Sequence, residues 1–202
     1  MSAAGPRWQR RPQTRRDELL DAATALLQKF PLDEVKVSDI TEAAGTSKGT
    51  FYTYFATKEA LYAALKERYL DGLVEVMAEA RRNSGARDWC GQMDAAVEAI
   101  VAYMYEADEL IEVWGREASQ PGEPDIFLMG TNRIASELAA EIGKETAAGR
   151  LDCADPFAAA MLIVHAIDST VSDDMMGRTG QESLGPDRIA KAAQAMIRGL
   201  VG

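Results

Sequence analysis

The stretch VSDITEAAGTSKGTFYTYFATK, residues Val37–Lys58, decides how this chain begins to fold. In its first half, apolar residues recur with helical spacing at Val37, Ile40 and Ala44. Gly45 follows directly, and glycine tolerates the left-handed backbone that ends a helix and turns the chain. The pattern predicts a helix of about two turns followed by a sharp turn.

A second short helix is predicted after the turn, because Thr46 or Ser47 can accept hydrogen bonds from its first free N–H groups. Phe51 and Phe55 stand four residues apart and can pack inward together. A core helix would not carry the polar and aromatic residues that cover its remaining surface, which are Lys48, Thr50, Tyr52 and Tyr54.

Two short helices joined by a glycine turn are typical of a helix-turn-helix, whose second helix enters the major groove of DNA. The run resembles the DNA-binding domain of tetracycline-repressor (TetR) family regulators. The residues that match the family's pattern are Asp39, Ile40, Ala44, Gly45, Ser47, Gly49, Thr50, Tyr52, Tyr54, Phe55, Lys58, Glu59 and Leu61. Substitutions of similar size stand at Thr41, Thr46, Phe51 and Thr57, and Pro31 replaces a glycine that commonly follows the first helix.

The resemblance implies an all-α protein with an N-terminal three-helix helix-turn-helix domain. A C-terminal helical domain for ligand binding and dimerisation would complete it, with about nine helices in all. We expect a flexible basic arm at residues 1–13, the DNA-binding domain at residues 14–60 and the sensing and dimerising domain at residues 61–202.

Helical periodicity continues through most of the chain, in segments separated by glycine and proline. Pro31 should end the first helix, and Asp155 followed by Pro156 is a start signal. The expected helices span residues 14–30, 58–82, 88–106, 108–118, 124–148, 156–175 and 187–200.

The last two predicted helices carry more apolar surface than one small domain consumes. Nearly every residue from Phe157 to Ile167 is apolar. TetR-family proteins pair these helices with those of a second copy, so the resemblance implies a homodimer on a palindromic DNA operator. The alternative is burial of this surface within one chain. The last helix forms one apolar stripe of Ile189, Ala192, Ala193, Met196, Ile197 and Leu200.

The net charge of −10 over 202 residues is unusual for a DNA-binding protein, but it is unevenly distributed. Residues 1–70 hold 11 Lys and Arg against 9 Asp and Glu, a net charge of +2, whereas residues 71–202 hold 11 against 23, a net charge of −12. The N-terminal part can therefore approach phosphate while the acidic part stays away from it.

Residues 1–16 carry five arginines and no acid, at Arg7, Arg10, Arg11, Arg15 and Arg16. An arm of this kind can contact phosphates or enter a narrow minor groove, and a solvated tail is the alternative. The segment lacks the apolar core of a signal peptide, and no apolar run has the length of a membrane span. We expect a cytoplasmic protein.

Chemistry and the resemblance together assign the DNA contacts. Lys48 can bond guanine or phosphate, and Thr50 can present a methyl to thymine. Tyr52 and Tyr54 offer phenolic donors to backbone oxygens, while Lys58 adds its charge at a helix N-terminus. The full predicted DNA-binding set is Ser38, Ser47, Lys48, Gly49, Thr50, Tyr52, Tyr54 and Lys58.

The resemblance also implies an unknown small-molecule effector, bound among the helices of the second domain, that lowers operator affinity. His165 needs a partner inside its apolar helix, and Asp168 could supply one. The predicted lining residues are Trp89, Met93, Tyr103, Met104, Trp114, Phe127, Met161, His165 and Asp168, and ordinary core packing is the alternative for each.

Repression is expected because the family leans that way. The alternatives are a constitutive repressor or one regulated by a protein partner, without a small ligand. A hydrolase is a weaker alternative, because Gly45–Gly49 fits the G-x-S-x-G pattern around Ser47 but lacks a preceding strand. Cys90, Cys153 and His165 do not make a recognisable metal site, so no metal or cofactor is expected.

Overall fold

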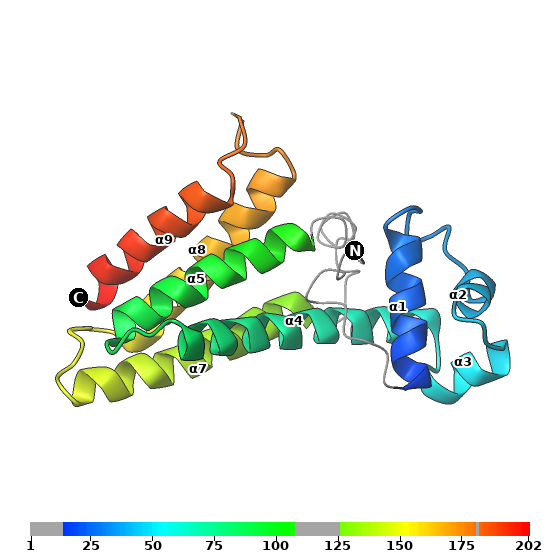
Figure 1. The fold of residues 1–202 in the computed structure, drawn as a ribbon, viewed down its shortest axis with the longest axis horizontal. Helices are drawn as coiled ribbons and strands as arrows, with labels where there is room; N and C mark the ends of the chain where they lie inside the picture. Colours follow the sequence, from blue (N-terminus) through cyan, green and yellow to red (C-terminus); the bar gives the residue numbers. More distant parts are fainter. Residues whose placement is uncertain (1–13, 108–125, 181) are drawn as a thin grey trace.

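The computed structural model describes residues 14–107, 126–180 and 182–202, and every regular element in these ranges is an α-helix. The predicted all-α fold class is confirmed. The expected arm at residues 1–13 and the expected helix at 108–118 lie outside the described residues. The described helices form two lobes, and the long helix α4 runs from one into the other (Figure 1).

The smaller lobe contains α1 (Arg15–Leu27), α2 (Val37–Ala43) and α3 (Lys48–Tyr54), packed around the first turns of α4 (Lys58–Asn83). Its core is built from Leu19, Leu20, Ile40, Phe51 and Leu61, all fully buried.

The start and end of α1 have identifiable causes. The Thr14 hydroxyl accepts a hydrogen bond from the Asp17 N–H at 3.3 Å, which satisfies one of the free donors of the first turn. The helix ends at Leu27, before the expected residue 30. The N–H groups of Lys29 and Phe30 both donate to the Leu26 carbonyl, so the last turn tightens before Pro31.

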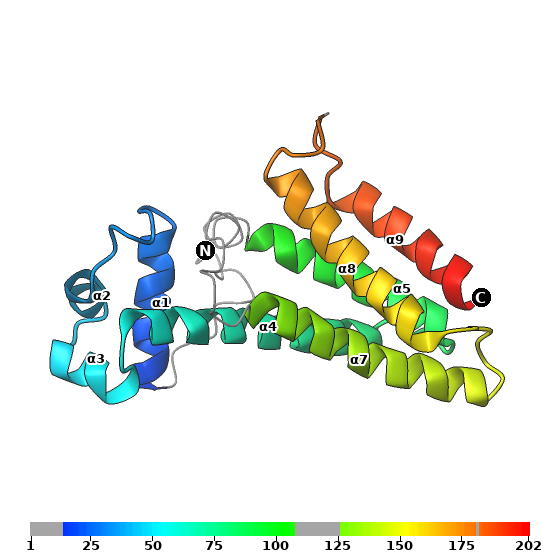
Figure 2. The ribbon, with the colours of Figure 1, turned by 180° about the vertical axis from the view of Figure 1, so that it is seen from behind.

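The larger lobe surrounds the second half of α4. It contains α5 (Trp89–Glu106), α7 (Ile126–Ala147), α8 (Pro156–Met175) and α9 (Pro186–Val201), with bounds within two residues of those predicted. Helices α5 and α7 pack on α4, while α8 packs on α7 and α9. Figure 2 shows the same arrangement from behind. Helices α5 and α8 lie between α4 and α9.

One buried carboxylate ties three segments of the larger lobe together. Asp174, near the end of α8, is only 5% exposed. It accepts hydrogen bonds from the Tyr105 hydroxyl of α5, the Ser183 hydroxyl and the N–H groups of Leu184 and Gly185. These bonds, led by that of Tyr105, hold the pKa of Asp174 below its usual value. Asp174 thereby fixes the chain where it enters α9.

None of the described helices combines the length and apolar content needed to cross a bilayer. Cys90 is half-buried, Cys153 is buried, and both are free thiols.

Candidate DNA-reading surface and ligand cavity

The turn between α2 and α3 has the geometry that its glycine predicts. Gly45 has a φ of 60°, in the left-handed region. Its N–H donates to the Glu42 carbonyl at 3.0 Å, and the Thr46 N–H donates to the Thr41 carbonyl at 2.8 Å. These two bonds satisfy carbonyls at the end of α2 and direct the chain into α3.

Ser47, rather than Thr46, caps α3. Its hydroxyl oxygen accepts from the Thr50 N–H at 3.1 Å and lies 3.0 Å from the Thr50 hydroxyl. Both hydroxyls are therefore already engaged within the first turn. Ser38 on α2 is half-buried and donates to the Asp39 carboxylate at 3.3 Å.

Helix α3 presents a buried aromatic face and an exposed polar one. Phe51 and Phe55 are 0% and 3% exposed, with ring centroids 5.7 Å apart. On the other side, Tyr52 and Tyr54 are 56% and 44% exposed. Exposed phenolic rings on a helix anchored by buried phenyl rings can reach a partner without disturbing the core. Three further α3 residues are exposed, namely Lys48, Gly49 and Thr53, of which Thr53 was not predicted.

Lys58 is bound within the protein rather than extended into solvent. Its Nζ donates to the carbonyls of Leu32 and Val35, both at 3.0 Å, and lies 5.5 Å from the centre of the Tyr62 ring. Both carbonyls belong to the loop between α1 and α2. Lys58 therefore fastens that loop to the start of α4, and its contact with DNA remains a prediction.

A second long-range contact joins α4 to α1. The Arg68 guanidinium donates to the Asp21 carboxylate at 2.6 Å and to the Thr24 hydroxyl at 3.2 Å. Only 11% of the Arg68 side chain is exposed. Sequence reasoning did not find this pair, because its members are more than forty residues apart and no local pattern links them.

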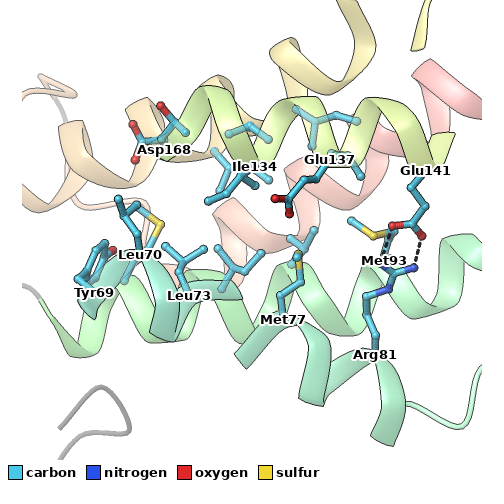
Figure 3. A pocket seen from close by; sticks show the side chains of 18 residues that line it. Tyr69, Leu70, Leu73, Met77, Arg81, Met93, Ile134, Glu137, Glu141 and Asp168 are labelled. Atoms are coloured by element: carbon cyan, nitrogen blue, oxygen red, sulfur yellow. Dashed lines mark hydrogen bonds and ion pairs between the residues drawn. The ribbon is translucent and has the colours of Figure 1, made fainter. Parts of the chain in front are cut away.

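The larger lobe encloses a cavity of about 150 Å³ between α4, α5, α7 and α8. Figure 3 shows that Tyr69 and Asp168 lie toward one end, Arg81 and Glu141 toward the other, and Glu137 between them. The described lining residues are Tyr69, Leu70, Leu73, Met77, Arg81, Met93, Val97, Ile100, Met104, Thr131, Ile134, Glu137, Leu138, Glu141, Ile163, Val164, Ile167 and Asp168.

Of the lining residues expected from sequence, the structure brings Met93, Met104 and Asp168 to the cavity. Trp114 and the side chain of Phe127 lie outside the described part of the chain. The remaining expected residues, Trp89, Tyr103, Met161 and His165, are not among those that line it.

Two of these four residues do not line the cavity themselves but donate hydrogen bonds to residues that do. The indole Nε1 of Trp89 donates to Glu141 at 2.7 Å, and the Tyr103 hydroxyl donates to the Tyr69 carbonyl at 3.2 Å. His165 faces α7, where its Nε2 lies 3.2 Å from the amide oxygen of Asn132. Asn132, on the neighbouring helix, is therefore its partner, rather than the expected Asp168.

Arg81, Glu141 and Trp89 form a polar network at one end of the cavity. The two terminal guanidinium nitrogens of Arg81 each donate to a different carboxylate oxygen of Glu141, one of them at 2.9 Å. The hydrogen bond from Arg81 lowers the pKa of Glu141, and the same bond raises the pKa of Arg81. Both groups are therefore charged at neutral pH, and the arginine is committed to an internal partner.

The lining residues on α4 carry a signal that sequence reasoning missed. Tyr69, Leu73, Met77 and Arg81 recur every four residues, so they lie along one face of the helix. Apart from Leu70, the remaining lining residues come from three other helices, and only the packed structure identifies them.

A short exposed helix after a glycine turn on a three-helix lobe, joined by α4 to a helical body with a cavity, is the arrangement of helix-turn-helix proteins. Residues 19–65 match the family model for bacterial regulatory proteins of the tetR family, and residues 123–200 match that for the C-terminal domain of AefR-like transcriptional repressors. The chain belongs to the TetR family.

Individual relatives agree with this membership. The uncharacterised HTH-type transcriptional regulator YvdT of Bacillus subtilis is 43% identical over 54 residues, which cover 27% of this chain and 28% of that protein. The HTH-type transcriptional regulator EthR of Mycobacterium tuberculosis is 39% identical over 84 residues, covering 38% and 39%. The chain thus matches less than half the length of these curated relatives.

The fold is similar to solved structures over nearly the whole chain. A TetR transcription regulator from Haloarcula marismortui superimposes with a TM-score of 0.76 and 15% identity, covering 93% of this chain and 98% of the other. At that identity the likeness establishes the fold alone.

Proposed function

We propose that this protein is a DNA-binding transcriptional regulator that reads its operator with α3. The exposed Tyr52 and Tyr54, anchored by the buried Phe51 and Phe55, are the observation that carries the proposal. Lys48 and Gly49 stand exposed in the first turn of α3, where a reading helix meets base edges. In the division of the chain that we propose, residues 14–60 read DNA, residues 61–202 sense and dimerise, and α4 connects the two functions.

The proposed active form is a homodimer joined through α8 and α9. Phe157 and Leu162 on α8 are 58% and 57% exposed, an unusual position for large apolar side chains. A groove of about 420 Å³ lies between the two helices, lined mainly by apolar residues including Ala166, Ala192 and Met196. A second copy would cover this surface and place two reading helices on a palindromic operator.

The proposed activity is repression that a small molecule relieves. The cavity in the larger lobe favours this version over a constitutive or protein-regulated repressor, since a filled core would offer a ligand no space. Its lining residues Tyr69 and Leu70 adjoin Arg68, which bonds to α1. A ligand that shifts α4 could therefore move the reading lobe. The site of action of such a regulator is the cytoplasm.

The hydrolase alternative finds no support in the geometry around Ser47. The Ser47 hydroxyl caps α3, and His165 lies in the other lobe, bonded to Asn132. The regular element before Ser47 is helix α2, whereas a nucleophile elbow follows a strand. We therefore infer that the chain acts as a regulator rather than as an enzyme.

Selection of DNA from a random duplex library tests the proposal. We expect an enriched palindrome, bound by a dimer, with an affinity that falls steeply as salt increases. Tyr52→Ala should weaken binding to every sequence, whereas Lys48→Ala should also relax base preference.

The matched control is Arg82→Ala, which removes an exposed cation from the far end of α4. It should leave the affinity and the salt dependence unchanged. Failure to enrich any sequence, together with normal non-specific binding by Tyr52→Ala, would exclude α3 as the reading helix.

A further inference from the structure

The cavity of the larger lobe is elongated. Tyr69 and Arg81 both line it and stand twelve positions apart on α4, a distance of about 18 Å along the helix axis. We call this elongated cavity, of about 150 Å³, the slot. Its length suits an extended alkyl chain.

Most of the slot is apolar. Aliphatic and Met side chains from four helices line it, among them Leu73, Met77, Val97, Ile134 and Ile163. Burying apolar surface against such walls is worth about 25 cal/mol per Å², so a hydrocarbon chain would gain affinity along its whole length.

Acidic side chains outnumber basic ones in the described part of the wall. The described lining contains one cation, Arg81, and three acids, Glu137, Glu141 and Asp168. The two terminal nitrogens of Arg81 already donate to Glu141, which also accepts from Trp89. An incoming anion would have to break this pair and would then face the Glu137 carboxylate.

Glu137 marks where a charged head group would sit. It lines the slot yet is exposed to solvent, so it stands where the slot opens. Figure 3 shows its carboxylate directed toward the space between α7 and α4, midway along the cavity. A cation beside it would keep part of its hydration while its chain lies in the slot.

We propose that the cavity binds amphiphilic cations, in which a single alkyl chain carries an ammonium group that pairs with Glu137. This inference rests on the proposed function, because it names the chemical class of the effector that would act on the proposed repressor. We expect a fatty acid of the same chain length to bind the slot more weakly.

Three probes with the same chain, short enough to reach from Glu137 to one end of the slot, test the inference on DNA-free protein: octyltrimethylammonium, octanoate and an uncharged octyl glycol ether. Titration calorimetry below their micelle-forming concentrations should show the cation binding at least about tenfold more tightly than the anion. The uncharged ether should fall between them. Equal or tighter binding of octanoate would overturn the inference, as would failure of all three probes to bind.

Two variants locate the site. Glu137→Gln should weaken binding of the cation roughly fivefold, as expected for a partly exposed ion pair, and leave binding of the uncharged ether unchanged. Glu79→Gln makes the same change at an exposed α4 position outside the slot and should alter neither affinity. Leu73→Trp should reduce binding of both probes by filling the slot, with its fold checked by circular dichroism. If Glu137→Gln bound the cation as tightly relative to the uncharged ether as the wild type does, the pairing of the ammonium group with Glu137 would be contradicted.

Failure of this inference can be told apart from failure of the proposed function. Release of a selected operator by octyltrimethylammonium is measured separately, by fluorescence anisotropy of labelled DNA. Tight binding of the cation without release of DNA leaves the inference standing and refutes induction by this ligand. Release of DNA by octanoate but not by the cation overturns the inference and supports a ligand-responsive repressor.

Discussion

In the smaller lobe, the surface that we propose reads DNA comes from one run of about a dozen residues, Ser47–Lys58. In the larger lobe, the cavity is lined by side chains from four helices. The described lining residues are spread between positions 69 and 168 of the chain. Both sites belong to one helical protein and share α4. The difference shows that a site built within one supersecondary unit is visible in the sequence, whereas a site built between distant helices depends on their packing.

The two lobes also differ in the charge of the polar side chains at their candidate sites. The smaller lobe exposes Tyr52 and Tyr54 on a surface without carboxylates on α3. The larger lobe carries the acidic excess of the chain and places Glu137 and Asp168 in the cavity wall. In the two functions that we propose, this difference would direct phosphate to the smaller lobe and cations to the larger one.

The largest effect on stability should appear when a substitution on the buried face of α3 is compared with one on its exposed face. Phe51→Ala removes a fully buried ring and should destabilise the smaller lobe by about 3–5 kcal/mol. Tyr52→Ala, one residue on, removes a ring that is 56% exposed and should leave the free energy of unfolding nearly unchanged. Urea denaturation followed by circular dichroism measures both. Equal destabilisation by the two variants would mean that Tyr52 is part of the core and not of the reading surface.

A smaller effect is expected in the larger lobe at Asp174. Asp174→Asn replaces one acceptor oxygen by an NH2 donor, so either the Leu184 N–H or the three donors to the other oxygen lose their acceptor, at a cost of at least about 2 kcal/mol. Because the pKa of Asp174 is lower in the folded protein than in the unfolded chain, its stabilisation is complete above the unfolded pKa and is lost as pH falls through the folded pKa.

The pH dependence of thermal unfolding checks this assignment. The difference in Tm between the wild type and Asp174→Asn should be largest near pH 7 and should shrink below about pH 4. Asp173→Asn is the matched control, since this neighbour is 52% exposed and lies 3.7 Å from Arg178. It should change the Tm little at any pH. A difference in Tm that stays constant down to acid pH would contradict the role of the Asp174 carboxylate.

The smallest effect concerns Lys58, where the structure sharpens the expectation from sequence. Lys58→Met removes hydrogen bonds to two loop carbonyls and should destabilise the smaller lobe by about 1 kcal/mol. If Lys58 acts on DNA binding only by holding this loop, Lys58→Met should weaken binding on all sequences with an unchanged salt slope. In Lys48→Met the slope should instead fall by about 1. The same drop in Lys58→Met would support the direct phosphate contact that the sequence predicts for Lys58.

Most of the helix boundaries could be predicted because each depends on neighbouring residues. Asp155 and Pro156 start α8, Gly45 ends α2, and Ser47 caps α3, all within a few positions of the groups that they satisfy. The end of α1 was placed about three residues too late, since a tightened last turn before Pro31 leaves no distinct mark in the sequence.

The candidate sites were predictable to different degrees. For DNA reading, the exposure of Lys48, Tyr52 and Tyr54 agrees with the spacing that selected them. For the cavity, Met93 and Met104 were found as apolar residues on a helix, while Trp89 belongs behind the wall. The sequence alone could not show which face of each helix turns toward the cavity.

The helices, the glycine turn and the aromatic spacing of α3 can be read from the sequence, because hydrogen bonds and side-chain spacing within a few residues dictate them. The packing of the helices, in contrast, brings Lys58 to a loop, His165 to Asn132 and Arg81 to Glu141. These pairings join residues 23 to 60 positions apart along the chain, so they exist only once the helices have packed.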